Sequence, residues 1–85
     1  MKKYVVAELW NGIEAEKVFD DKEKAIYEAE GEIARMTKHD KKRLEYLEVW
    51  EVELTESEWK QFDIEGLIED NPLSSYVDAI VWEWK

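Results

Sequence analysis

Residues 3–19, KYVVAELWNGIEAEKVF, decide the fold of this chain. Residues 3–10 are rich in β-branched and aromatic side chains, which favour a strand. Asn11-Gly12 follows them, and this dipeptide best tolerates the two positive φ angles of a type I′ turn. Residues 13–19 then place alternate side chains on opposite faces, as a strand does. The sequence therefore predicts a β-hairpin.

A long amphipathic helix is expected directly after the hairpin. Residues 20–23 (DDKE) have the form of a capping box, with the Asp20 side chain accepting from a backbone N–H and the Glu23 side chain reaching back. We place the helix at about residues 21–38, with the basic residues of segment 35–43 at its carboxyl end, where the helix dipole favours positive charge. Its apolar stripe, at helical spacing, consists of Ala25, Ile26, Ala29, Ile33 and Met36.

The second half of the chain predicts two more strands and a short helix. Residues 44–54 (LEYLEVWEVEL) and 76–84 (YVDAIVWEW) have the composition of strands. Residues 55–58 (TESE) form a second capping box, and the short helix behind it is interrupted by Gly66. The apolar face of that helix would hold Trp59, Phe62 and, near its end, Leu67.

The direction of the chain predicts the topology. The hairpin strands are antiparallel, and the helix then returns the chain, so that strand 44–54 can pair beside the first strand in the spatial order 2-1-3. The sequence leaves open where the fourth strand adds. The expected fold is α+β in a single domain, residues 1–85. It has a mostly antiparallel sheet of about four strands (a ββαβ core plus the carboxyl-terminal strand), one long helix on one face and one short second helix.

Composition and charge restrict the classes of partner that we expect this protein to bind. The chain has 85 residues, no cysteine and a net charge of −10. Segment 35–43 is basic, whereas residues 44–85 carry most of the acidic excess. An acidic chain repels nucleic acid and anionic membranes, so we expect neither as a partner. No apolar run approaches the roughly 20 residues of a membrane span, and no signal peptide follows the start, which favours a soluble, cytoplasmic protein.

The residues that carry chemistry are few, and we expect no enzyme, no cofactor and no metal site. The only histidine, His39, lies among charged residues in an expected surface loop. No phosphate-binding glycine loop, nucleophile elbow or zinc-binding motif occurs. The acidic group at residues 63–70 has neither the spacing nor the glycine of a calcium loop.

The apolar side chains on both faces of the expected sheet indicate a surface that binds another protein. Both sides of the first and fourth strands are apolar, yet the long helix can cover only one face. Either segment 56–69 or another protein chain covers the second face, and the five tryptophans are either the core of a small domain or part of an interface. A monomer and a weak homodimer are both compatible with this pattern. The candidate interaction surface consists of Trp10, Trp82, Trp84, Glu51, Glu53, Glu56 and Glu58.

The segments VFDDKEKAIYEAE (18–30) and MTKHDKKRLEYLEVWEVEL (36–54), with the hairpin before them, resemble small uncharacterised acidic proteins encoded by phages and integrative mobile elements of Gram-positive bacteria. The resemblance covers about residues 4–54 and implies a setting rather than an activity. Some small acidic proteins of such elements inhibit host defence as nucleic-acid mimics. The leading expectation is a non-enzymatic protein–protein interaction module whose partner is unknown, and basic if charge drives the association. The alternative is a DNA-mimic inhibitor of a nucleic-acid-binding host-defence protein.

Overall fold

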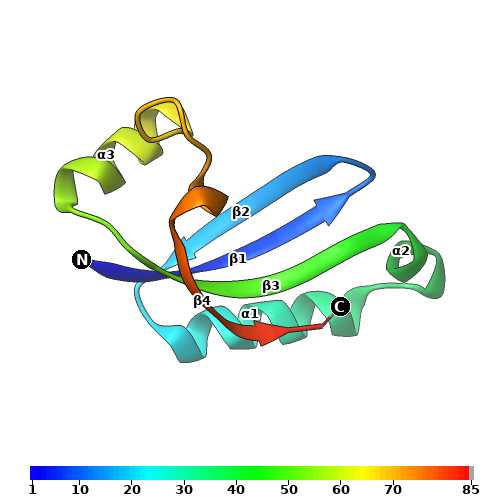
Figure 1. Ribbon diagram of the computed structural model, residues 1–85. Helices are drawn as coiled ribbons and strands as arrows, with labels where there is room; N and C mark the ends of the chain where they lie inside the picture. Colours follow the sequence, from blue (N-terminus) through cyan, green and yellow to red (C-terminus); the bar gives the residue numbers. More distant parts are fainter. Residues whose placement is uncertain (85) are drawn as a thin grey trace.

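The computed structural model describes residues 1–84, and its fold is α+β, as predicted (Figure 1). An antiparallel sheet in the order β2-β1-β3-β4 separates α1 on one face from α3 on the other. The elements are β1 (Lys2–Trp10), β2 (Ile13–Phe19), α1 (Lys22–Arg35), α2 (Lys38–Arg43), β3 (Leu44–Glu53), α3 (Glu56–Glu65), the 3₁₀ turn η1 (Leu73–Tyr76) and β4 (Val77–Glu83).

The hairpin forms as the sequence predicts. Asn11 and Gly12 have φ angles of +47° and +83°, the two positive values of a type I′ turn. The turn sets the register, so that Trp10 lies opposite Ile13 and Tyr4 lies opposite Phe19.

The helix predicted over residues 21–38 ends at Arg35, and a separate short helix follows it at Lys38–Arg43. Asp21, not Asp20, is the N-cap, because its backbone is extended and its side chain accepts from the N–H of Glu23. At the other end Met36 leaves the helical conformation (φ −79°, ψ 140°), so α1 is shorter than predicted. Thr37 then caps the separate helix α2 through a reciprocal capping box with Asp40. His39 therefore lies on a short exposed helix rather than in a loop.

The order 2-1-3 is confirmed, and β4 completes the sheet beside β3. Their antiparallel register pairs Glu48 with Glu83 at one end and Val52 with Val77 at the other, with two irregularities between. The carboxyl end of β4 thus lies beside the start of β3, directly after α2.

The two faces of the sheet carry separate hydrophobic clusters. On the α1 face, the alanines of the helix stripe and alternate residues of β1 and β3 are fully buried; these are Val6, Ala25, Ala29, Leu44, Leu47 and Val49. On the α3 face the buried residues are Val5, Ala7, Trp50, Val52, Leu54, Trp59, Ile68 and Leu73. Each of the central strands β1 and β3 supplies both clusters.

The segment 56–76 covers only part of the α3 face. Gly66 ends α3 with a φ of +74°, as expected of a left-handed cap. Trp59 is buried and Phe62 packs against the same cluster, as the apolar pattern predicts. The inclusion of Leu67 was wrong: its side chain is 41% exposed, and Ile68 is buried in its place. The chain reverses at Gly66, so the helical spacing no longer applies there.

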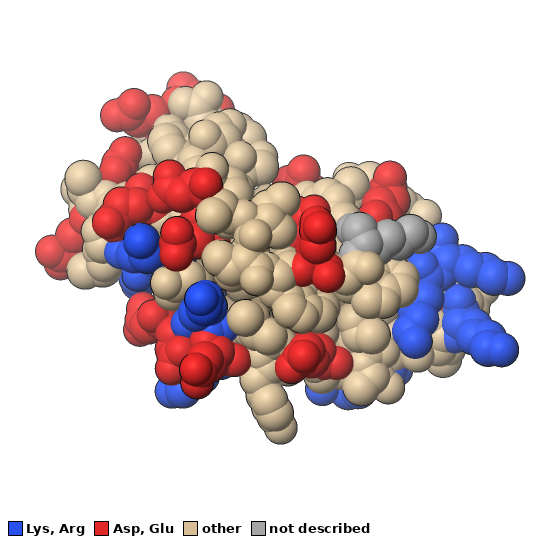
Figure 2. Space-filling model, turned by 60° about the horizontal axis from the view of Figure 1, so that its bottom comes forward, with Lys and Arg blue, Asp and Glu red and all other residues tan. Residues whose placement is uncertain are grey.

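Charge is distributed unevenly over the surface. Figure 2 shows lysines and arginines gathered at the end of the molecule where α2 lies, and acidic residues spread over the remainder of that face. No acidic or basic residue among those described is buried. Within residues 1–84, no helix is long and apolar enough to cross a membrane.

Candidate functional site: an acidic sheet surface

The part of the α3 face nearest the hairpin turn is not covered by segment 56–76 (Figure 1). Side chains from β2, β1 and β3 lie in transverse rows there, because strand register aligns them. The row nearest the turn consists of Glu14, Leu9 and Tyr46, and the next row consists of Glu16, Ala7 and Glu48. We call Glu14, Glu16, Tyr46 and Glu48 the acidic sheet surface.

The carboxylates of this surface lack cationic partners. Within the described part of the chain, Glu14, Glu16 and Glu48 form no ion pair. Burial, and then the negative charge of Glu14, raise the pKa of Glu16 above its usual value. The surface therefore concentrates negative charge, with Glu16 partly removed from water and Glu14 exposed beside it.

Tyr46 lies among these carboxylates. Burial raises the pKa of its phenol, and the charges of four glutamates raise it further; these are Glu14, Glu48, Glu16 and Glu45. Its ring centroid lies 6.4 Å from that of Trp50. The half-buried Tyr46 thus offers an aromatic ring within a strongly negative potential.

Hydrogen bonds position two carboxylates at the margin. The indole Nε1 of Trp50 donates to Glu48 Oε1 at 2.7 Å, and Trp50 is itself 5% exposed. The backbone N–H of Gly12 donates to Glu45 Oε2 at 2.9 Å, which ties the hairpin turn to the start of β3. These bonds hold the carboxylates in place but leave their negative charge uncompensated.

On the opposite sheet face, two carboxylates of α1 lie close to β2 and pair with its lysine. Lys17 Nζ lies 3.2 Å from Glu28 Oε1 and 3.5 Å from Glu32 Oε1, on α1. Burial nevertheless raises the pKa of Glu32, outweighing the attraction of Lys17, and the buried Oε2 of Glu32 has no hydrogen-bond partner among the described residues. The two faces of β2 therefore differ. On the α1 face Lys17 pairs with glutamates of α1, whereas Glu14 and Glu16 on the other face have no cationic partner among the described residues.

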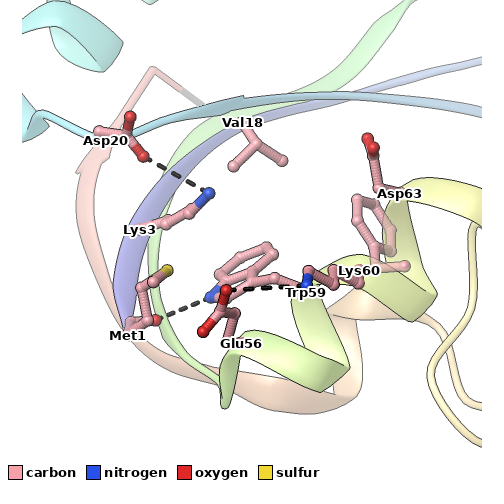
Figure 3. A pocket seen from close by; sticks show the side chains of 9 residues that line it. Met1, Lys3, Val18, Asp20, Glu56, Trp59, Lys60 and Asp63 are labelled. Atoms are coloured by element: carbon pink, nitrogen blue, oxygen red, sulfur yellow. Dashed lines mark hydrogen bonds and ion pairs between the residues drawn. The ribbon is translucent and has the colours of Figure 1, made fainter.

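A second candidate is a hollow between α3 and the ends of the hairpin strands (Figure 3). Its volume is about 480 Å³. The indole Nε1 of Trp59 donates to the carbonyl oxygen of Met1 at 2.7 Å, and Lys3 Nζ lies 5.4 Å from the centroid of the indole ring. The remaining lining residues are Val18, Asp20, Glu56, Lys60, Phe62 and Asp63.

Most charges of this hollow are already paired. Lys3 Nζ lies 3.5 Å from Asp20 Oδ1, and Lys60 Nζ lies 3.7 Å from Glu56 Oε1 (Figure 3). A charged ligand would have to compete with these contacts. The acidic sheet surface needs no such exchange, so it is the stronger candidate.

No group of three or more histidine, aspartate or glutamate side chains within residues 1–84 is arranged to hold a metal ion.

The tryptophans predicted for the interaction surface lie on the α1 face. Trp10, Trp82 and Trp84 are half-buried and pack against the cluster on that face. Trp10 Nε1 also donates to Glu8 Oε2 at 3.0 Å. The register places Trp82 opposite Val49, near the free edge of the sheet.

The glutamates predicted for the same surface have contacts within the chain. Glu51 accepts from the Tyr4 hydroxyl and lies 3.7 Å from Lys2 Nζ. Glu53 pairs with the amino terminus, Glu56 with Lys60, and Glu58 completes the capping box of Thr55. The register places Glu51 and Glu53 on the α1 face, as it does the three tryptophans, whereas Glu56 and Glu58 lie on α3 at the other face of the sheet.

Sequence reasoning did not identify Glu14, Glu16, Tyr46 and Glu48 as a site. Glu14 and Glu16 share a strand face in the pattern of residues 13–19, which reads as an ordinary solvated face. Only the register of β1 with β2 and β3 shows that Tyr46 and Glu48 complete the same rows.

Comparison with known proteins gives no relative: no family model matches the chain, and neither the curated proteins nor the solved structures contain a significant match.

Proposed function

We propose that this protein is a non-enzymatic interaction module that binds a basic segment of a partner protein through the acidic sheet surface. The observation that carries the proposal is the set of uncompensated carboxylates around Tyr46 on the uncovered part of the sheet. The partner segment presents arginine or lysine side chains.

Basic side chains fit this surface in two ways. Glu16 and Glu48 flank β1 from the neighbouring strands, so their Cα atoms are about 10 Å apart, which is within reach of two cationic side chains of one segment. Charge-assisted hydrogen bonds to partly buried carboxylates are stronger than neutral ones. The ring of Tyr46 adds a cation–π contact, worth about 0.5–1 kcal/mol at an exposed site. Electrostatic steering would speed the encounter and make it salt-dependent.

The alternative proposal, a DNA mimic, requires a long ridge of carboxylates that imitates phosphates. Several acids elsewhere on the molecule have cationic partners within the chain, which interrupt such a ridge; examples are the pairs Lys17–Glu28, Lys2–Glu51 and Lys60–Glu56. A local acidic patch suits a peptide segment better than it suits the footprint of a duplex. We further propose that the module acts in the cytoplasm and belongs to a phage or mobile element, on the resemblance of residues 4–54.

A peptide-binding experiment tests the proposal. The probe is a fluorescent decapeptide rich in arginine and lysine, with a neutral peptide of the same length as reference, measured by fluorescence anisotropy. The site variant replaces Glu14, Glu16 and Glu48 by glutamine. The control variant makes the same change at Glu23, Glu30 and Glu65, which lie on α1 and α3 and have no ion pair within the described chain. Both variants have the same net charge.

We expect the basic peptide to bind the natural protein and the control variant alike. The site variant should lose about tenfold or more in affinity, since it removes two or more charge-assisted contacts. Equal weakening by both variants would show that net charge alone attracts the peptide and would overturn the proposal. If duplex DNA displaces a partner that the protein captures, the mimic proposal is favoured instead.

A further inference from the structure

The part of the α3 face near the hairpin turn is a sheet surface with no helix packed on it. The opposite face is covered by α1, whereas segment 56–76 does not extend over this part (Figure 1). Ile80, which the register places opposite Trp50, is 50% exposed, and Leu9 and Tyr46 are half-buried. A sheet face that carries apolar side chains is ordinarily buried against another layer of structure. This surface therefore has the character of a docking face.

A transverse row with three carboxylates crosses the face from one edge of the sheet to the other. The register places Glu16 opposite Ala7 and Ala7 opposite Glu48, and Glu83 of β4 lies opposite Glu48. Glu83 is exposed and forms no ion pair within residues 1–84. Like charges directly opposite one another destabilise a sheet. A cation bound between Glu48 and Glu83 would remove that repulsion.

We infer that the basic partner segment is an α-helix that lies across the strands, along the row from Glu83 to Glu16. This inference rests on the proposed function and adds Glu83 to the binding residues. The backbone of the partner is the reason for a helix. The central strands β1 and β3 pair with neighbours on both sides, so they offer no backbone hydrogen bonds to a segment lying on the face. An extended segment would leave its own N–H and C=O groups unpaired against the sheet, whereas a helix pairs them internally.

The spacing of the row fits a helix. Neighbouring strands lie about 4.8 Å apart, so Glu48 and Glu16 lie about 4.8 Å and about 14 Å from Glu83 along the row. Helix residues i+3 and i+10 lie about 4.5 Å and about 15 Å from residue i along the axis, on the same side of the helix. Basic side chains at i, i+3 and i+10 therefore meet the three carboxylates one to one.

The position between Glu48 and Glu16 favours an apolar side chain. Ala7 lies there, about 9.6 Å along the row from Glu83, and it is 1% exposed. Helix position i+7, about 10.5 Å along the axis, lies above this methyl group, with Leu9 on the same face of β1. Ile80 adds apolar surface on β4 for the aliphatic stem of the first basic side chain. The partner helix thus presents three basic residues and one aliphatic residue in a single stripe.

Two alanine-rich helical peptides of identical composition test the inference by fluorescence anisotropy. The first carries arginine at i, i+3 and i+10 and leucine at i+7, whereas the second distributes its three arginines around the helix. Circular dichroism first establishes that the free peptides are equally helical. We expect the natural protein to bind the first peptide about tenfold or more tightly than the second, because only the first makes all three charge-assisted contacts at once.

The role of Glu83 is measured with Glu83→Gln and a matched control, Glu30→Gln. Glu30 is an exposed glutamate of α1 that forms no ion pair within the described chain. Glu83→Gln should weaken the first peptide about threefold or more, and Glu30→Gln should leave its affinity unchanged. Glu83→Arg should weaken it further, and a peptide with glutamate at position i should recover the affinity for that variant.

The outcomes separate this inference from the proposed function. If the two helical peptides bind equally and the glutamine variant of Glu14, Glu16 and Glu48 weakens both, the acidic sheet surface binds basic segments but the helix inference is wrong. Equal effects of Glu83→Gln and Glu30→Gln would also overturn it. If the basic decapeptide binds and neither helical peptide does, only the helix inference fails, and if no basic peptide binds, both fail.

Discussion

Glu16 and Glu48 lie on opposite sides of Ala7, on the two strands that flank β1, and neither carboxylate pairs with a cation in residues 1–84. Ala7 between them is 1% exposed, so the row joins two charged groups above a buried methyl group. Burial and the negative charge of Glu14 disfavour the charged form of Glu16 on this surface, which costs stability in the free protein when Glu16 is ionised.

The pKa of Tyr46 reflects the electrostatic potential of the acidic sheet surface. Burial and the surrounding glutamates raise the pKa of its phenol above the ordinary 10.0. Replacing Glu14 and Glu48 together by glutamine should lower this pKa, because two of the raising charges are removed. NMR titration of ring-labelled tyrosine would measure the change, with Tyr27, 79% exposed on α1, as the internal control. An unchanged pKa of Tyr46 would contradict the assignment of these charges.

Glu16 makes stability depend on pH. Its pKa is raised in the folded protein above the reference value of 4.5, so the folded state binds this proton more tightly than the unfolded chain. The contribution of Glu16 to stability therefore rises as the pH falls through the folded pKa toward 4.5, and it falls as the pH rises. Urea unfolding at about pH 7 and about pH 5 should show a smaller gain on acidification in Glu16→Gln than in the natural protein.

Lys17 stabilises the opposite face of β2. Lys17→Met should lower the free energy of unfolding by about 1 kcal/mol, because Glu32, whose side chain is 12% exposed, loses its cation. The loss should shrink at low pH, where Glu32 is protonated. Lys60→Met is the matched control: Lys60 and Glu56 are 74% and 72% exposed, so its effect should stay within about 0.5 kcal/mol. Equal losses in the two variants would contradict this role of Lys17.

Replacing Gly12 or Gly31 by alanine should change the stability of the protein in opposite directions. Gly12→Ala should destabilise the protein by about 1 kcal/mol, because the φ of +83° strains any residue with a Cβ, although no atom lies within 4 Å of the new carbon. Gly31→Ala should stabilise α1 by about 0.5–1 kcal/mol. Its new Cβ meets only the guanidinium of Arg35, at 3.2 Å, which lies at the end of a flexible, exposed side chain. Thermal unfolding of both variants gives the two signs in one experiment.

The strands and the order 2-1-3 of the first three were predictable because turn chemistry and alternation act locally, whereas the place of β4 beside β3 was left open. Asn11-Gly12 fixes the hairpin, and the apolar stripe from Ala25 to Met36 places α1 on the sheet. The helix α2 was missed because none of its residues is buried, so no apolar periodicity marks it. Its signal was the capping box of Thr37 and Asp40, which resembles those that were recognised.

The candidate site was less predictable because it depends on register between strands distant in sequence. Leu9 pairs with both Glu14 and Tyr46, and only the second pairing crosses more than thirty residues. A strand pattern shows which side chains share a face but not which of them are neighbours across strands.

The two hydrophobic clusters share the strands β1 and β3 but contain different helices, so one layer of the molecule can unfold locally without the other. Segment 56–76 can separate from the sheet while α1, β1 and β3 keep the other cluster intact, because no side chain of α3 reaches the α1 face. Amide hydrogens of α3 should then exchange with solvent through a partial opening, earlier than those of β1, whose protection requires both layers to be lost. Residues such as Val5 would become exposed in the open form, which would therefore present a second apolar surface that α3 otherwise covers.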